Sequence, residues 1–227
     1  MATRIALAGN PNCGKTTMFN NLTGATQYVG NWPGVTVEKK EGRFKHNKEV
    51  IITDLPGIYS LSPYTMEEVV SRNYLIDERP DVILNLVDAS NIERNLYLTT
   101  QLLELGIPTV VALNMMDVVQ KNGDVIDLKK LSALLGCEVV ETTALKGRGT
   151  KDAAEAALAA SKHSAEPVRI TFSEDVENAL SAIIQLIGSA VPESEARWFA
   201  IKLFERDEKI SELVSLSVDA KEQIEQI

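Results

Sequence analysis

The chain has 227 residues, of which 44% are hydrophobic and 24% charged, and its net charge is −9. This length and composition are typical of a soluble globular protein with one full domain and a smaller addition. The acidic balance disfavours non-specific binding to nucleic acid, two cysteines exclude a disulfide framework, and no apolar run reaches the roughly 18 residues of a membrane span.

The first predicted elements surround a glycine-rich loop. Residues 4–8 form an apolar run that predicts a strand, and residues 15–23 predict a helix. Between them, GNPNCGKT matches the phosphate-binding pattern G-x-x-x-x-G-K-[ST] at every fixed position. In this pattern the lysine reaches the β- and γ-phosphates and the last hydroxyl binds Mg²⁺. The residues expected to bind the phosphates are Asn10, Pro11, Asn12, Cys13, Gly14, Lys15, Thr16 and Thr17.

Residues 25–35 predict a long loop, which we name the lid, because they are rich in Gly, Asn and Pro. The length of this loop beside a phosphate-binding loop indicates a segment that closes over the nucleotide. Gly34 and Val35 are expected to contact the nucleotide. Thr36 is the candidate for a second Mg²⁺ ligand, and the alternative is that Thr36 only starts the next strand.

Residues 36–44 and 49–53 predict a hairpin that leads into Asp54-Leu55-Pro56-Gly57. A carboxylate at this strand end can hold Mg²⁺ through water, and the Gly57 N–H can sense a γ-phosphate. The next residue, Ile58, stands where many GTPases have the glutamine that orients the attacking water.

A helix is predicted over residues 65–76, with Thr65 as its N-cap. Glu67 and Glu68 lie in its first turn. They are either substitutes for the missing glutamine or simple partners of the helix dipole.

Strands and helices then alternate, which implies a mainly parallel sheet covered on both faces. Together with the earlier segments this gives an α/β fold with six strands. The predicted strands here are 82–87, 109–113 and 137–141, and the predicted helices are 93–105, 127–135 and 150–161.

Asn114-Met115-Met116-Asp117 follows a buried strand, at the edge where open α/β sheets bind their ligands. The Asp117 carboxylate can accept hydrogen bonds from N1–H and the exocyclic amine of guanine, groups that adenine lacks. After the last strand, Thr143, Ala144 and Leu145 can place a backbone N–H on the guanine O6. The expected ligands are therefore GTP and GDP with Mg²⁺.

The strand pattern stops near Pro167, which predicts a GTP-binding domain over 1–165 and a small helical domain over 166–227. Helices are expected over about 176–187 and 192–206, followed by two shorter ones. The pattern is still helical at Ile227, so we expect the chain to continue in the full-length protein.

Six segments together resemble the cytosolic GTPase domain of the FeoB family of prokaryotic ferrous-iron transporters: GNPNCGKTT, VGNWPGVTVE, DLPGIYSLSP, NLYLTTQLLE, ALNMMD and TTALKG. The resemblance is close over residues 3–161, and the tail is similar to the family's helical domain. It implies a Ras-like P-loop GTPase fold, Mg²⁺-dependent GTP hydrolysis and a membrane-embedded iron-permeation region as partner. The expected location is the cytoplasmic face of the cell membrane.

The same resemblance implies a K⁺ ion beside the nucleotide. Asn12 matches the phosphate-loop asparagine that binds this ion, and Gly30 and Trp32 lie in the segment whose carbonyls complete its shell. From the residues alone, Asn12 could instead hold the shape of the loop. The residues expected to act on the reacting γ-phosphate are Asn12, Lys15, Thr36 and Gly57.

A soluble GTPase of ribosome assembly or tRNA modification is the alternative, because such enzymes share the pattern without glutamine. They normally carry a basic RNA-binding surface, which this acidic chain lacks. Iron binding by the chain itself has little support, since its two histidines and two cysteines form no cluster. No nucleic-acid partner is expected, and a homo-oligomer is an open alternative.

Overall fold

The structure is a computed structural model that describes residues 2–24, 27–62, 64–162, 171–193 and 195–227. The chain forms two compact units, which we describe separately. The first contains residues 1–103 and 107–168, and the second contains 104–106 and 169–227. The predicted boundary between residues 165 and 166 lies outside the described residues.

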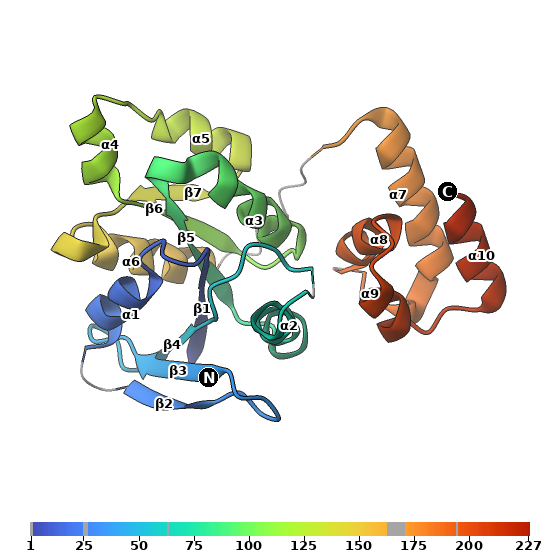
Figure 1. The fold of residues 1–227 in the computed structure, drawn as a ribbon, viewed down its shortest axis with the longest axis horizontal. Helices are drawn as coiled ribbons and strands as arrows, with labels where there is room; N and C mark the ends of the chain where they lie inside the picture. The colour runs from blue at the N-terminus through green and yellow to red at the C-terminus, as the bar shows by residue number, and fades with distance from the viewer. Residues whose placement is uncertain (1, 25–26, 63, 163–170, 194) are drawn as a thin grey trace. The chain divides into compact units, whose positions relative to one another are not determined.

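The first unit contains a seven-stranded sheet in the order β2-β3-β4-β1-β5-β6-β7 (Figure 1). Strand β3 pairs antiparallel with β2 and β4, and the other neighbours are parallel. This topology confirms the predicted mostly parallel α/β fold. The strands are β1 Thr3–Gly9, β2 Gln27–Asn31, β3 Glu38–Arg43, β4 Val50–Asp54, β5 Val82–Asp88, β6 Thr109–Asn114 and β7 Glu138–Glu141.

The sheet has one strand more than the six predicted. The additional strand is β2, which forms within the segment expected to be a loop. Its residues pair with β3 in a continuous register from Gln27↔Gly42 to Asn31↔Glu38. The sequence of β2 itself carries little strand pattern. We therefore attribute this strand to its backbone pairing with β3. Residues 27–31 of the lid are therefore the outer edge of the sheet.

Helices cover both faces of the sheet, as predicted. One apolar cluster joins α1 and α6 to one face, and a second joins α3, α4 and α5 to the other (Figure 1). Neighbouring residues of β6 alternate between them: Val110 and Ala112 belong to the first cluster, and Val111 and Leu113 to the second. The helices are α1 Lys15–Thr23, α2 Met66–Asn73, α3 Ile92–Glu104, α4 Met116–Asn122, α5 Leu128–Leu135 and α6 Thr150–Ala160.

Helix α2 begins with the predicted cap. Thr65 Oγ1 accepts the Glu68 N–H at 3.2 Å, and the Glu68 carboxylate accepts the Thr65 N–H at 3.1 Å. This reciprocal pair favours a capping role for Glu68 over a role in orienting water. The predicted helix continues beyond α2 as a π-helix, Tyr74–Glu78.

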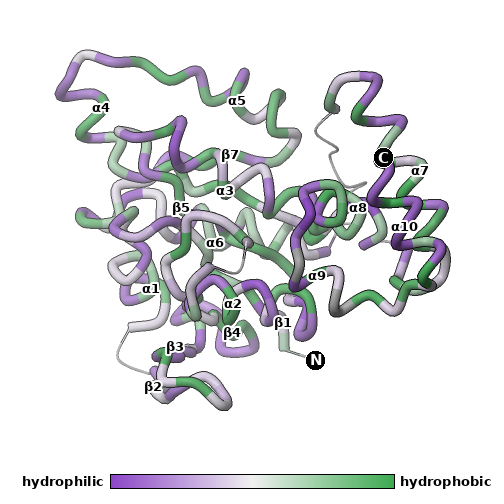
Figure 2. The backbone as a smooth tube through the Cα atoms, turned by 45° about the vertical axis from the view of Figure 1, so that its right-hand side comes forward, coloured by the Kyte–Doolittle hydropathy of each residue, from purple (hydrophilic) through white to green (hydrophobic). Residues whose placement is uncertain are grey.

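Two strands of the sheet differ sharply in hydropathy (Figure 2). The central strand β5 is hydrophobic along most of its length, whereas β3, with the sequence EKKEGR, is hydrophilic. Central parallel strands are covered on both faces, so their sequences read as continuous apolar runs.

The second unit consists of helices joined by short non-helical connections in its described residues, as predicted. Helix α7 packs against α8 and α10. Their facing side chains, among them Leu180, Ile183, Trp198 and Leu203, are buried. The helices are α7 Glu174–Ile187, α8 Ala196–Phe204, α9 Glu208–Leu213 and α10 Val218–Gln226. No helix in the described part of the chain is both long and apolar enough to span a membrane.

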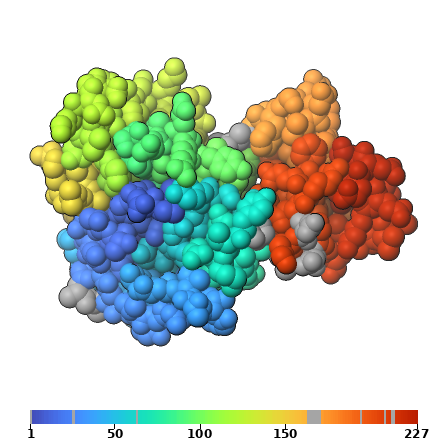
Figure 3. All heavy atoms as spheres, in the orientation of Figure 1, coloured from blue at the N-terminus to red at the C-terminus, as the bar shows by residue number. Residues whose placement is uncertain are grey.

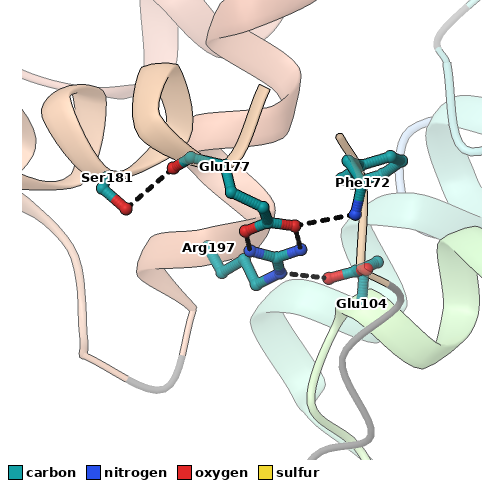
Figure 4. Close-up of polar contacts among 5 residues, drawn as sticks. All are labelled: Glu104, Phe172, Glu177, Ser181 and Arg197. Carbon is teal, nitrogen blue, oxygen red and sulfur yellow. Dashed lines mark hydrogen bonds and ion pairs between the residues drawn. The ribbon is translucent and has the colours of Figure 1, made fainter. Parts of the chain in front are cut away.

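Arg197, in the first turn of α8, is the centre of a polar cluster in this unit (Figure 4). Its two terminal nitrogens bind the two carboxylate oxygens of Glu177 at 2.8 and 2.9 Å, and its Nε binds Glu104 at 3.0 Å. Glu177 also accepts the Phe172 N–H at 2.9 Å. The side chain of Glu104 is only 8% exposed, so its charge needs this partner.

We expect Arg197→Ala to lower the free energy of unfolding of the helical unit by about 2–4 kcal/mol, because it removes the ion pairs of two carboxylates, one of which is buried. Arg197→Lys should recover part of this loss, since lysine keeps the charge but not the two-pronged contact. Chemical denaturation followed by circular dichroism measures the effect. The control is Lys151→Ala, which removes an exposed ion pair with Glu155 and should cost less than about 1 kcal/mol. Equal losses in both alanine variants would contradict the role of Arg197.

Candidate nucleotide-binding site

The loop between β1 and α1 surrounds a cavity of about 440 Å³. Asn12 and Gly14 both have positive φ, 66° and 96°. At Gly14 a Cβ atom would lie 2.4 Å from Asn114 Nδ2, so only glycine fits there. The lining residues are Asn10, Pro11, Asn12, Gly14, Lys15, Thr16, Thr17 and Gly57. Eight of the residues predicted to bind nucleotide therefore meet in one cavity.

Cys13 is buried and does not line this cavity. Burial raises the pKa of its thiol to about 11, so the thiol is protonated and unreactive at neutral pH. The Cys13 carbonyl accepts a hydrogen bond from Asn114. These contacts give Cys13 a structural place in the loop.

Lys15 and Asp54 form an ion pair in which Lys15 Nζ lies 3.0 Å from Asp54 Oδ1. Both side chains are nearly buried, at 11% and 7% exposed. Burial raises the pKa of Asp54, and the neighbouring lysine opposes that shift. The pair places the carboxylate at the end of β4 next to the phosphate loop, as the two motifs predict.

The segment after β4 lies against the phosphate loop. A Cβ atom at Gly57 would be 3.1 Å from the Pro11 Cα. In the space-filling view the dark-blue atoms of the phosphate loop lie beside the cyan atoms of this segment (Figure 3). The Ile58 side chain is buried, and its N–H donates to the Gly9 carbonyl at 3.3 Å. An apolar, buried side chain cannot orient a water molecule.

Two residues of α3, not singled out from the sequence, hold the same segment. Gln101 Oε1 accepts the Leu61 N–H at 2.7 Å. The guanidinium carbon of Arg94 lies 4.2 Å from the centre of the Tyr59 ring. Residues 94 and 101 are seven apart and share one helix face, a spacing that could have indicated this role.

On the base side, the buried Asn114 joins two loops. Its Nδ2 donates to the Cys13 carbonyl at 2.8 Å, and its Oδ1 accepts the Ala144 N–H at 2.9 Å. Asn21, which the sequence did not single out, donates to the Ala144 carbonyl at 2.6 Å. The predicted Thr143–Leu145 segment thus lies next to the predicted Asn114–Asp117 segment, where Met115 has a positive φ of 63°.

Asp117 accepts a hydrogen bond from Lys146, with Oδ2 and Nζ 2.8 Å apart. This bond holds the pKa of the Asp117 carboxyl below its usual value. The carboxylate is therefore ionised at neutral pH, as guanine recognition requires. Lys146 comes directly after the predicted Thr143–Leu145 motif, and its role was not evident from that motif. Leu145 itself is 86% exposed.

The predicted lid residues lie elsewhere in this structure. Within the described chain, the phosphate cavity is not lined by Gly30, Trp32, Gly34, Val35 or Thr36. Trp32 and Val35 instead line a second cavity with α2, and Thr36 is exposed. The roles predicted for these five residues require another arrangement of the lid.

The donor set of the phosphate cavity suits a phosphate with Mg²⁺. Lys15 and Thr16 line the cavity, and the Asp54 carboxylate is ion-paired with Lys15. The buried Asn10 amide nitrogen has no acceptor among the described residues. Cationic and N–H donors favour an anionic ligand, and carboxylate and hydroxyl oxygens are Mg²⁺ ligands. The described chain contains no cluster of three or more His, Cys, Asp or Glu side chains that could hold a metal.

Comparisons with known proteins agree with this site. Residues 3–157 match the family model of ferrous iron transport protein B, and residues 172–227 match the FeoB cytosolic helical domain. A FeoA–FeoB fusion protein of Porphyromonas gingivalis is 46% identical over 93% of this chain and 26% of its own length. The Fe(2+) transporter FeoB of Shigella flexneri is 44% identical over 89% of this chain and 27% of its own length. The chain thus spans about a quarter of these relatives.

A solved structure extends the likeness to both units. NFeoB from S. thermophilus, bound to GDP, AlF₄⁻ and K⁺, has a TM-score of 0.91 and 50% identity, covering 99% of this chain and 88% of that chain. Together with the P-loop site and the two matched domains, this shows that the chain belongs to the FeoB family of ferrous iron transport proteins, as its N-terminal GTP-binding part.

Proposed function

We propose that this chain hydrolyses GTP and regulates a ferrous-iron transporter of which it is the N-terminal part. The observation that carries the proposal is the meeting of three motif residues, Lys15, Asp54 and Asn114, around one cavity and its neighbouring loops. The S. thermophilus relative bound to GDP, AlF₄⁻ and K⁺ supports it. Family membership favours this function over the RNA-associated alternative. The transport partner would be the rest of the full-length chain, at the cytoplasmic face of the membrane.

The reaction is the in-line attack of water on the γ-phosphate of GTP. Lys15 binds the β- and γ-phosphates once it leaves Asp54, and the N–H groups of the loop and of Gly57 hold the phosphate oxygens. Thr16, Thr36 and Asp54 would hold Mg²⁺, and Asn12 with the carbonyls of Gly30 and Trp32 would hold K⁺. When bound, these cations stabilise the negative charge that develops on the phosphates.

The first test concerns the base. We expect Asp117→Asn to weaken GTP binding by about 1–3 kcal/mol and to strengthen binding of xanthosine triphosphate, because asparagine offers a donor where guanine needs an acceptor. Competition with a fluorescent guanine nucleotide measures both affinities. Asp124→Asn, which alters an exposed carboxylate beyond α4, is the control and should leave both unchanged. Unaltered GTP affinity in Asp117→Asn would refute the base assignment.

The second test concerns potassium. Ile58 cannot orient water, so a monovalent cation held by Asn12 is expected to supply stabilisation that an arginine finger contributes elsewhere, which is worth up to roughly 10³–10⁵ in rate. GTP turnover should be faster in KCl than in NaCl at equal ionic strength, and Asn12→Ala should remove the difference. Equal turnover of the unmodified protein in the two salts would exclude potassium from the mechanism. Stimulation that persists in Asn12→Ala would place the ion elsewhere.

A further inference from the structure

The side chain of Trp32 fixes the lid against the body of the first unit. Its ring meets Tyr74 edge-on, with ring centres 5.2 Å apart and planes at 68°. Lys39 Nζ lies 5.0 Å from the centre of the Trp32 ring. Only 7% of Trp32 is exposed, although it lies in a turn at the edge of the sheet. An aromatic residue on the lid is thus held between β3 and the start of the π-helix.

The backbone of Trp32 is engaged as well. Its N–H donates to the Val37 carbonyl at 2.9 Å, and its carbonyl accepts the Val35 N–H at 3.3 Å. The preceding residues, Gln27–Asn31, are paired with β3. The proposed function needs the Trp32 carbonyl for K⁺ and Thr36 for Mg²⁺. Among the described residues neither lines the phosphate cavity, so both roles require the lid to leave its present position.

Tyr74 is a fixed anchor for this contact. Its hydroxyl bonds with Thr53 Oγ1 at 3.1 Å, one residue before Asp54. The guanidinium of Arg4 lies 5.8 Å from the centre of its ring. Because strands β1 and β4 both hold Tyr74 in place, a separation of the two rings requires movement of Trp32 and the lid.

The contact is also incomplete, which makes it reversible. The buried Trp32 Nε1 has no hydrogen-bond acceptor among the described residues. A cavity of about 340 Å³ adjoins the indole, and its lining comes from the lid, β3, α2 and the π-helix, including Val35, Val70 and Tyr74. An unpaired buried donor weakens the packed arrangement. A ligand with several cation and phosphate contacts can therefore displace it.

We propose that the Trp32 side chain is a positioning element that holds the lid away from the phosphate cavity, and that GTP draws it out of its contacts with Tyr74 and Lys39. This inference rests on the proposed function, in which the lid closes over GTP. The indole touches neither substrate nor ions and acts through the position of the lid. The strength of the Trp32 contact with Tyr74 and Lys39 sets the fraction of molecules whose lid is free to close.

The fluorescence of Trp32 tests the movement directly. The chain has two tryptophans, so Trp198→Phe leaves Trp32 as the only one. A non-hydrolysable GTP analogue with Mg²⁺ and K⁺ should shift the Trp32 emission to longer wavelength, because the indole leaves a buried site. GDP with the same ions should give a smaller shift. An unchanged emission with the analogue bound would overturn the proposal.

Two Tyr74 variants test the energetic role. Tyr74→Leu removes the ring that holds Trp32, and should raise the affinity for the analogue relative to GDP about three- to tenfold. Tyr74→Phe keeps the ring and loses only the bond to Thr53, so its affinity ratio should stay within about twofold of the unmodified protein. Mere damage to the fold would weaken both nucleotides equally. An unchanged ratio in Tyr74→Leu would overturn the proposal.

The outcomes separate the two levels of inference. If the unmodified protein shows K⁺-dependent hydrolysis, but the Trp32 emission and the affinity ratio of Tyr74→Leu do not change, the proposed function stands and the regulatory role of Trp32 is refuted. Failure of the analogue to bind, or of GTP to be hydrolysed, contradicts the proposed function and the role of Trp32 with it.

Discussion

The buried amide of Asn114 is the contact on which the nucleotide-binding edge of the first unit depends. It bonds to the loop after β1 through Cys13 and to the loop after β7 through Ala144. Leaving a buried amide unpaired costs about 1–3 kcal/mol, so these loops hold one relative geometry. The phosphate and base halves of the site are therefore set together, and Gly14 must be glycine because the same amide approaches it.

Motifs that follow strands could be placed from the sequence. Parallel strands bring their carboxyl ends to one edge, so the residues after β1, β4, β6 and β7 were expected to meet there. The Lys15–Asp54 ion pair and the Asn114–Ala144 bond confirm this for the phosphate loop and the base loops. The cap at Thr65 was equally readable, because a helix N-cap depends on residues within one turn.

Features that depend on distant partners could not be predicted in this way. Strand β2 forms because β3 offers a paired edge, and nothing local in its sequence requires a strand. Helix α4, which was not predicted, is short and begins after Met115, whose backbone is left-handed. No helix N-cap residue in the sequence indicates this start. The partners of Trp32 lie on β3 and beyond α2, so only the fold brings them together.

The place of β2 at the rim of the sheet has a consequence for solubility. If the proposed closure of the lid unpairs β2, then β3 becomes the new edge of the sheet and exposes unpaired backbone groups that invite pairing with another molecule. The strand beneath, β3, carries Glu38, Lys39, Lys40 and Glu41 in succession. Charges on an edge strand oppose such association. The hydrophilic sequence of β3 would then protect the protein against aggregation.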